Sequence, residues 1–327
     1  MKPLVSIGVP LYNAEKHVAN IRRLWNQSYP NIEVIISDNG STDRTALLAR
    51  KALRNKKNAT FRSYPTNRGL SWNFNRTFRM ARGKYFMWAS LDDRRAPNYI
   101  EKCVEVMESS PAVVLAVPTV HVAIENCPGL LYTVDVQEAS RARSLSERLS
   151  YALGGFPAVG LYGLFRAKAL ARTRLMSPFP GGDLLLIPEI ALLGEIRHVA
   201  GTTLTYFGRK NWNSPKQDYQ AFTGKKDRPP CFPGIRIWRE HIFRIGRTRF
   251  SKMEKSRLLL VTVVHLQKAL LFRFAKRIAQ VLPGKKARVR LLERLYPIGF
   301  KNPGLQIQNL RMFRKRVIHP VMGALPS

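Results

Sequence analysis

The chain has 327 residues and a formal net charge of +34, from 55 Lys and Arg against 21 Asp and Glu. Its hydrophobic content of 45% is typical of globular proteins and excludes a disordered chain, and no apolar run approaches the roughly 20 residues that cross a bilayer. The three cysteines lie far apart without CxxC spacing, which argues against a disulfide framework or a structural zinc site; nucleic acid, an anionic membrane and a phosphorylated substrate remain as partners for so basic a protein.

The first 120 residues alternate short strands with helices. Strands are predicted at 4–10, 32–37, 60–64, 84–89 and 113–117, and helices at 14–27, 44–54, 71–82 and 97–109. This alternation predicts an α/β fold, with a parallel sheet covered by helices on both faces. Ligands of such sheets bind at the carboxyl ends of the strands. Because Asp38, Asp92 and Asp93 directly follow predicted strands, we expect them near a binding site.

The rest of the chain is less regular, and its charge is uneven. We predict helices at 144–153, 166–174 and 183–193, strands at 160–165 and 199–207, and a long loop at 211–233. The net charges of residues 1–120, 121–233 and 234–327 are +10, +5 and +19. We therefore expect one domain with two halves, 1–120 and 121–233, and a basic helical extension at 234–327. The N-terminal apolar stretch is too short for a signal-peptide core, which predicts a cytoplasmic protein.

The carboxylates that follow the strands each allow two interpretations. Asp92 and Asp93 repel each other unless a cation or hydrogen-bond donors neutralise them, and Mg²⁺ or Mn²⁺ shared with a diphosphate would do so. Alternatively, an Asp at this place caps the helix that begins at Pro97. Asp38, which precedes Asn-Gly-Ser, either forms an Asx turn or accepts a hydrogen bond from a nucleobase. These residues alone leave both choices open.

Four segments, in this order, resemble one enzyme family. They are residues 5–13 (VSIGVPLYN), 35–43 (IISDNGSTD) and 81–85 (ARGKY), and then Asp92 with Asp93, followed by Pro97. Together they strongly resemble family 2 glycosyltransferases of the GT-A fold, over roughly residues 3–210. The resemblance implies a Rossmann-like, mostly parallel sheet with flanking helices. It also implies that a sugar is transferred from a nucleotide-diphosphate donor with inversion at the anomeric carbon.

The resemblance further implies a donor site. Pro10 and Tyr12 would pack against the nucleoside, and Asp38 would accept a hydrogen bond from the base, as expected for uracil or thymine, with a UDP-sugar favoured. The residues implied near the diphosphate or the sugar are Asn67, Arg68, Asn75 and Arg209. Arg68 suits a phosphate because its planar guanidinium donates two parallel hydrogen bonds.

The implied metal site departs from the family pattern. Asp92 falls on the last acid of the family's DxD motif and Asp93 on the acid that often follows it, so both are expected to bind Mg²⁺ or Mn²⁺. Ser90 occupies the position of the first acid, and a hydroxyl is a poor metal ligand. Lys210 or Asn211 stands where a metal-binding His is common in the family. Either the metal has fewer protein ligands, or basic side chains neutralise the diphosphate directly.

Asp183 is the candidate base. An inverting transfer needs a base that takes the proton of the acceptor hydroxyl, and Asp183 follows two glycines at the start of a predicted apolar helix. By composition Asp183 could simply cap that helix, whereas the resemblance implies the base. Glu189 is a second carboxylate on the same helix, and we expect it to face another helix. The implied acceptor is a glycan or a lipid-linked molecule, in cell-surface polysaccharide or glycolipid synthesis.

The basic extension contains an amphipathic helix. Its apolar residues follow one another at steps of three or four: Leu259, Val263, Leu266, Leu270, Phe274, Ile278 and Val281. Either this stripe docks on the catalytic domain and the cations are merely solvated, or residues 252–295 lie on an anionic membrane surface. The second interpretation would place the protein peripherally on the inner membrane face.

Two rival functions fit parts of the sequence. The high charge is typical of nucleic-acid-binding proteins, but the sequence has no helix-turn-helix, zinc-finger or RNP-like motif, so we expect no nucleic acid partner. A catalytically degenerate GT-A domain that only binds its ligand is the second rival, and Ser90 and Asn211 are the residues that indicate it.

Overall fold

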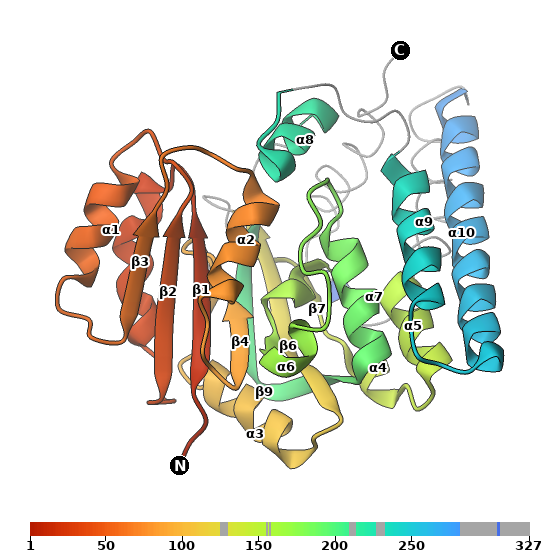
Figure 1. The fold of residues 1–327 in the computed structure, drawn as a ribbon, viewed down its shortest axis with the longest axis horizontal. Helices are drawn as coiled ribbons and strands as arrows, with labels where there is room; N and C mark the ends of the chain where they lie inside the picture. The colour runs from red at the N-terminus through yellow and green to blue at the C-terminus, as the bar shows by residue number, and fades with distance from the viewer. Residues whose placement is uncertain are drawn as a thin grey trace.

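A sheet covered by helices on both faces forms the centre of the molecule (Figure 1). The computed structural model describes residues 1–124, 130–154, 156, 158–208, 214–226, 233–281 and 306–307. The α/β class and the mostly parallel sheet expected from the sequence are confirmed.

The first half of the sheet is parallel. Its strands are β1 (Val5–Leu11), β2 (Ile32–Asp38), β3 (Ala59–Ser63) and β4 (Tyr85–Trp88), in the spatial order β3-β2-β1-β4. β1 lies between β2 and β4, with Leu11 opposite Asp38 and Gly8 opposite Trp88. The carboxyl ends of these strands therefore meet at one edge of the sheet, at the top of Figure 1.

The second half of the sheet has mixed strand directions. Its strands are β6 (Val113–Ile124), β7 (Leu130–Val134), β8 (Leu164–Arg166) and β9 (Glu195–Gly208), with the short strands β5 (Arg94–Arg95) and β10 (Gln306–Ile307). β6 runs parallel to β9 and antiparallel to β7 and β8, and β8 connects β6 to β4. The boundary predicted between residues 120 and 121 falls inside β6, so the two halves share one sheet.

The helices form two layers around the sheet. Those of the first half are the 3₁₀-helix η1 (Glu15–Trp25), α1 (Thr45–Leu53), α2 (Leu70–Arg79) and α3 (Tyr99–Ser109). The later ones are α4 (Gln137–Arg141), α5 (Leu145–Gly154), the 3₁₀-helix η2 (Ala158–Tyr162), α6 (Ala167–Leu170), α7 (Asp183–Leu193), α8 (Pro215–Thr223), α9 (Pro233–Gly246) and α10 (Lys252–Val281). Side chains alternate along a strand: Ile7 and Val9 face the layer of η1 and α3, whereas Phe86 and Trp88 face α2, α6 and α7. Strands buried on both faces explain the nearly continuous apolar runs.

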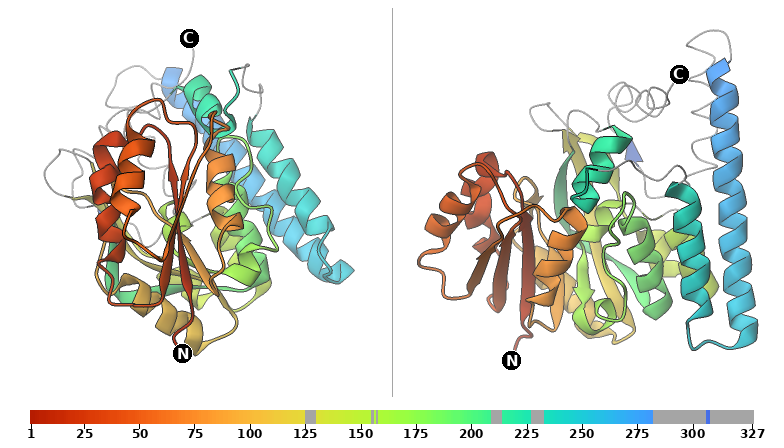
Figure 2. Two further views of the ribbon diagram at one scale, coloured as in Figure 1. Left: turned by 60° about the vertical axis from the view of Figure 1, so that its left-hand side comes forward. Right: turned by 45° about the horizontal axis from the view of Figure 1, so that its top comes forward.

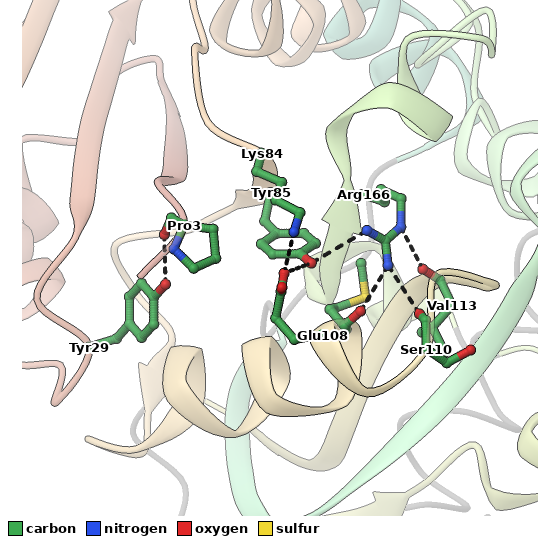
Figure 3. A network of polar contacts seen from close by, with 9 residues as sticks. Pro3, Tyr29, Lys84, Tyr85, Glu108, Ser110, Val113 and Arg166 are labelled. Atoms are coloured by element: carbon green, nitrogen blue, oxygen red, sulfur yellow. Dashed lines mark hydrogen bonds and ion pairs between the residues drawn. The ribbon is translucent and has the colours of Figure 1, made fainter. Parts of the chain in front are cut away.

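A polar network closes the opposite end of the sheet (Figure 3). The Arg166 guanidinium donates hydrogen bonds to the carbonyl oxygens of Met107 (2.8 Å) and Val113 (2.9 Å). The Tyr85 hydroxyl donates to Glu108 of α3. Because the last carbonyls of a helix lack partners within it, Arg166 both caps α3 and fixes it to the sheet, leaving the other end for a ligand.

Several segments differ from the sequence-based prediction, and the physical reason is clear for two of them. The strand predicted at 160–165 is η2 followed by the short β8, because the Gly163 N–H donates to the Gly160 carbonyl (3.0 Å) and closes a turn there. The loop predicted at 211–233 contains α8. The backbone and side chains of Ser214 and Gln217 form a reciprocal capping box at its start, and Gly224 ends it with a left-handed φ of 72°. Polar and glycine residues suggested a loop, but here they are helix caps.

Candidate active site

Asp38 lies at the end of β2 and is 1% exposed. Its carboxylate accepts hydrogen bonds from the hydroxyls of Ser41 and Ser63, the latter at 2.7 Å. These two hydroxyls hold the carboxylate between the loop that follows β2 and the end of β3. Each carboxylate oxygen can accept more than one hydrogen bond, so these two bonds do not use the full acceptor capacity of Asp38, and its contact with a nucleobase stays a prediction.

An exposed tyrosine follows the end of β1. Pro10 is half-buried in β1, and Tyr12, just beyond the strand, is 47% exposed. Asn13 fixes this segment: its N–H donates to Ser41 Oγ and its side-chain oxygen accepts from the Thr42 N–H, both at 2.9 Å. Asn13 itself has a φ of 46°, a left-handed conformation that Asn tolerates better than most residues. The Tyr12 ring is therefore held at the surface next to the carboxyl ends of β1 and β2.

Two residues that were predicted to bind the sugar donor, Asn67 and Asn75, form hydrogen bonds within the protein. Asn67 Oδ1 accepts hydrogen bonds from Asn39 Nδ2 (2.9 Å) and the Gly69 N–H (2.8 Å), which shapes the loop before α2. The Asn75 amide donates to the Met176 carbonyl and accepts from the Met176 N–H, both at 2.9 Å. Asn75 thus connects α2 to the segment before α7, and its predicted contact with the donor stays a prediction.

Arg68 lies in the loop before α2, and its contact with a phosphate stays a prediction. Its N–H donates to Asn39 Oδ1 (3.0 Å), which brings it to the loop that follows Asp38. Its guanidinium lies over the Trp72 ring, 4.9 Å from the centroid. Stacking on an aromatic face leaves the guanidinium edge free to donate two hydrogen bonds, and the described residues offer it no ion pair.

The adjacent Asp92 and Asp93 have different partners. Asp92 is half-buried and accepts a hydrogen bond from the Ser90 hydroxyl. Asp93 is buried: Oδ1 accepts from the Phe207 N–H (3.1 Å), and Oδ2 lies 3.9 Å from Arg95 Nη2. Burial raises the pKa of Asp93 to about 7. Among the described residues Asp93 Oδ2 has no hydrogen-bond partner, and the role of Asp93 as a metal ligand stays a prediction.

Asp92 is the less buried of the two predicted metal ligands. Within the described ranges, no cluster of three or more His, Cys, Asp or Glu is arranged to hold a metal ion. A single carboxylate nevertheless fits Mg²⁺ or Mn²⁺, because such ions are often held by one or two carboxylates together with substrate phosphates. Arg95 and Asp93 also line a cavity of about 470 Å³ between η1 and the 90–97 segment.

A glycine turn sets the position of Asp183. Gly182 is the N-cap of α7, so Asp183 is its first helical residue and is not the cap. Gly181 has a φ of 86°, and a Cβ on Gly182 would lie 2.5 Å from the Ser177 carbonyl oxygen. The turn is thus held tightly, and a carboxylate in the first turn of a helix is stabilised by the helix dipole. The side chain of Asp183 lies outside the described structure, as do Arg209, Lys210 and Asn211.

Glu189 has a structural role, as expected. Its carboxylate lies 2.5 Å from Arg244 Nη1 of α9 and accepts a hydrogen bond from the Arg174 N–H at 3.0 Å. Burial raises the pKa of Glu189, yet the two arginine contacts favour its charged form. Glu189 therefore joins α7 to α9.

Residues 6–168, which include Asp38, Arg68 and Asp92, match the family described as "Glycosyl transferase family 2". This family 2 segment makes up just under half of the chain. An uncharacterized glycosyltransferase of Haemophilus influenzae is 36% identical over 106 residues, covering 32% of this chain and 42% of that protein. A chondroitin synthase of Escherichia coli is 34% identical over 104 residues, covering 32% and 15%. The chain thus spans less than half the length of these curated relatives.

The whole fold also has a solved counterpart. S. aureus TarS 1–349, crystallised with UDP-GlcNAc, superposes with a TM-score of 0.62 over 91% of this chain and 81% of that one, at 16% identity. This similarity extends beyond the family 2 segment and confirms the GT-A fold expected from the sequence.

Asn73 is a residue of the family 2 segment that the sequence analysis missed. It is buried on α2, and its Nδ2 donates to the carbonyl oxygens of Leu11 and Ser37, both at 3.0 Å. Asn73 therefore holds the carboxyl ends of β1 and β2 together. The available signal was an Asn on the buried face of an amphipathic helix, because a buried amide needs hydrogen-bond partners.

The backbone of α8 packs directly on the Arg68 loop. A Cβ on Gly69 would lie 2.5 Å from the Thr223 carbonyl carbon and 2.6 Å from the Gly224 nitrogen. Gly69 also has a φ of 87°. Gly201 has a similar φ of 73°, but a Cβ there would have no heavy atom within 4 Å. An alanine at either position would strain the backbone, but only an alanine at position 69 would also meet α8. Comparing the two substitutions therefore separates the effect of strain from the effect of the α8 contact.

We expect Gly69→Ala to lower the free energy of unfolding by about 2–5 kcal/mol, because backbone strain and overpacking add. Gly201→Ala, with strain alone, is expected to cost about 1–2 kcal/mol. Urea unfolding of both variants measures the difference. Equal losses would show that the contact between Gly69 and α8 does not contribute to stability.

Proposed function

We propose that this protein is an inverting glycosyltransferase that moves a sugar from a nucleoside-diphosphate donor, preferably a UDP-sugar, to a hydroxyl of a glycan or lipid-linked acceptor. One observation carries the proposal. Within the family 2 segment, Asp38 ends β2, and Arg68 and Asp92 lie in the segments that follow β3 and β4, at the carboxyl edge of the sheet. A hydrogen-bond acceptor for the nucleobase, a guanidinium for the diphosphate and a carboxylate for the metal thus lie at one edge of the sheet.

The donor would be bound along this edge. The uracil N3–H would donate to Asp38, whose position the hydroxyls of Ser41 and Ser63 hold, and the exposed Tyr12 ring would pack on the nucleoside. The stacked guanidinium of Arg68 would donate two hydrogen bonds to the diphosphate. Mg²⁺ or Mn²⁺ held by Asp92 would neutralise charge on the departing diphosphate.

The transfer itself needs a base on the acceptor side. The acceptor oxygen forms its bond to the anomeric carbon while the bond from that carbon to the diphosphate oxygen breaks, and the hydroxyl proton passes to the Asp183 carboxylate. Attack opposite the leaving group inverts the anomeric carbon. The similarity of residues in the family 2 segment to a chondroitin synthase supports a glycan acceptor and a role in cell-surface polysaccharide or glycolipid synthesis.

A donor screen tests the proposal. The full chain is incubated with UDP-, GDP- and dTDP-sugars in the presence of Mg²⁺ or Mn²⁺, and the released nucleoside diphosphate is measured. We expect release of UDP from at least one UDP-sugar, and loss of release when EDTA removes the metal. A protein that neither binds nor cleaves any of the three donor classes would contradict the proposal.

A domain that only binds its ligand is the second candidate function. It is favoured by one observation. Ser90 stands in place of the first acid of the DxD motif, and its hydroxyl donates a hydrogen bond to the Asp92 carboxylate. Such a domain would bind UDP-sugars with the same dependence on Asp38 but release no UDP, with or without acceptor. Calorimetric binding measured beside UDP release separates the two functions.

A further inference from the structure

α10 has an inner face that docks on the rest of the molecule. Leu258 is buried and packs in an apolar cluster with Leu149 of α5 and Ile245 of α9. The ring of His265 hydrogen-bonds with Ser150 Oγ of α5 at 3.0 Å. The sequence left open whether an apolar face of this helix docks or stays free. This inner face docks.

The opposite side of α10 is also apolar. Its exposed residues are Met253, Leu260, Val263, Val264, Leu270, Leu271 and Phe274, each between 38% and 67% exposed. Met253, Leu260, Val264 and Leu271 are separated by steps of seven and four, so they lie along one line of the helix. These exposed residues form an outer stripe, which runs for about 30 Å at 1.5 Å per residue. α10 lies at the outer edge of the molecule in Figure 1 and in the right-hand view of Figure 2.

Cations border this stripe. Residues 233–281 contain 12 Lys and Arg against 2 Asp and Glu. Arg257 and Lys268 are exposed. Each lies four positions after one residue of the stripe and three positions before another, so each is next to the stripe on the helix surface. An apolar stripe bordered by cations is complementary to a bilayer with anionic headgroups, in which the stripe enters the interface and each cation contributes about 1 kcal/mol.

We propose that the outer face of α10 is a docking surface for an anionic lipid bilayer, on which the helix lies flat. No described helix is both long and apolar enough to span a membrane, so the contact is with the surface only. A second copy of the chain fits less well, because a two-fold contact would bring two basic helices face to face. The proposal does not depend on the proposed catalytic activity.

Co-sedimentation with vesicles tests the surface. The full chain is mixed with phosphatidylcholine vesicles that contain or lack phosphatidylglycerol. We expect binding to the anionic vesicles only, weakened by salt, and at least about tenfold weaker binding for L260E/L271E, because burying each Leu contributes about 1.5–3 kcal/mol. L47E is the matched control: Leu47 is 66% exposed, on α1 at the other side of the molecule, and we expect it to bind like the wild type.

Several results would overturn the proposal. They are unchanged binding of L260E/L271E, equal binding to vesicles without phosphatidylglycerol, or no binding of the wild type to either. A wild-type dimer in light scattering that L260E/L271E dissociates without lipid would show that a second copy covers the stripe. R257E/K268E should also reduce binding to anionic vesicles, and unchanged thermal unfolding of each variant shows that the surface and not the fold was altered.

Discussion

Replacing Asp183 by Asn is expected to lower the turnover number for sugar transfer by about 10²–10⁴-fold, the usual contribution of a general base. Affinity for the donor should stay within about twofold of the wild type. The reason is that Asp183 begins α7 behind the Gly181 turn, on the acceptor side in the proposed function. Nucleotide release at saturating acceptor gives the turnover number, and calorimetry gives the donor affinity.

Glu189→Gln is the matched control for Asp183→Asn. Glu189 lies on the same helix, but its carboxylate contacts Arg244 and the Arg174 N–H. We expect this variant to unfold at lower urea, with a loss of about 2–3 kcal/mol for a partly buried ion pair, and to keep its turnover number. If Asp183→Asn instead abolished donor binding, Asp183 would belong to the donor site. Equal turnover in the Asn variant and the wild type would remove it from catalysis.

Replacing Asp92 by Asn is expected to reduce UDP release by about 10²-fold or more, because the charge on the leaving diphosphate would lose its metal. Higher Mn²⁺ should partly restore activity, since the lost interaction is with the ion. The concentration of Mn²⁺ that gives half-maximal release is the decisive measurement, and it should rise in the variant.

Asp93→Asn separates the two neighbouring carboxylates. Asp93 faces Arg95 and the Phe207 N–H, but burial raises its pKa to about 7, so the neutral Asn resembles the protonated acid and we expect the fold to lose only about 1 kcal/mol. We expect the same half-maximal Mn²⁺ concentration as in the wild type. A shift as large as that of Asp92→Asn would make both residues metal ligands, as the family resemblance implied. A shift in Asp93→Asn alone would exchange their roles.

Local sequence patterns predicted most elements of the first half. β1, β2 and α2 lie within a few residues of their predicted positions, because an apolar run or an amphipathic repeat depends only on neighbouring residues. α8 was missed because its signals are caps: the reciprocal bonds of Ser214 and Gln217 begin it, in a segment whose composition is typical of a loop.

The sequence by itself determined that carboxylates follow strands at Asp38 and Asp92, since strand ends and parallel topology follow from the alternation of strands and helices. Only the tertiary structure decided what each polar side chain contacts. Asp93 lies against Arg95 and β9, Asn75 hydrogen-bonds to Met176, and Asn73 hydrogen-bonds to the ends of β1 and β2. It also showed that α10 docks through one face and leaves another apolar face exposed. Such choices depend on partners that packing brings from distant parts of the chain, and no local pattern contains them.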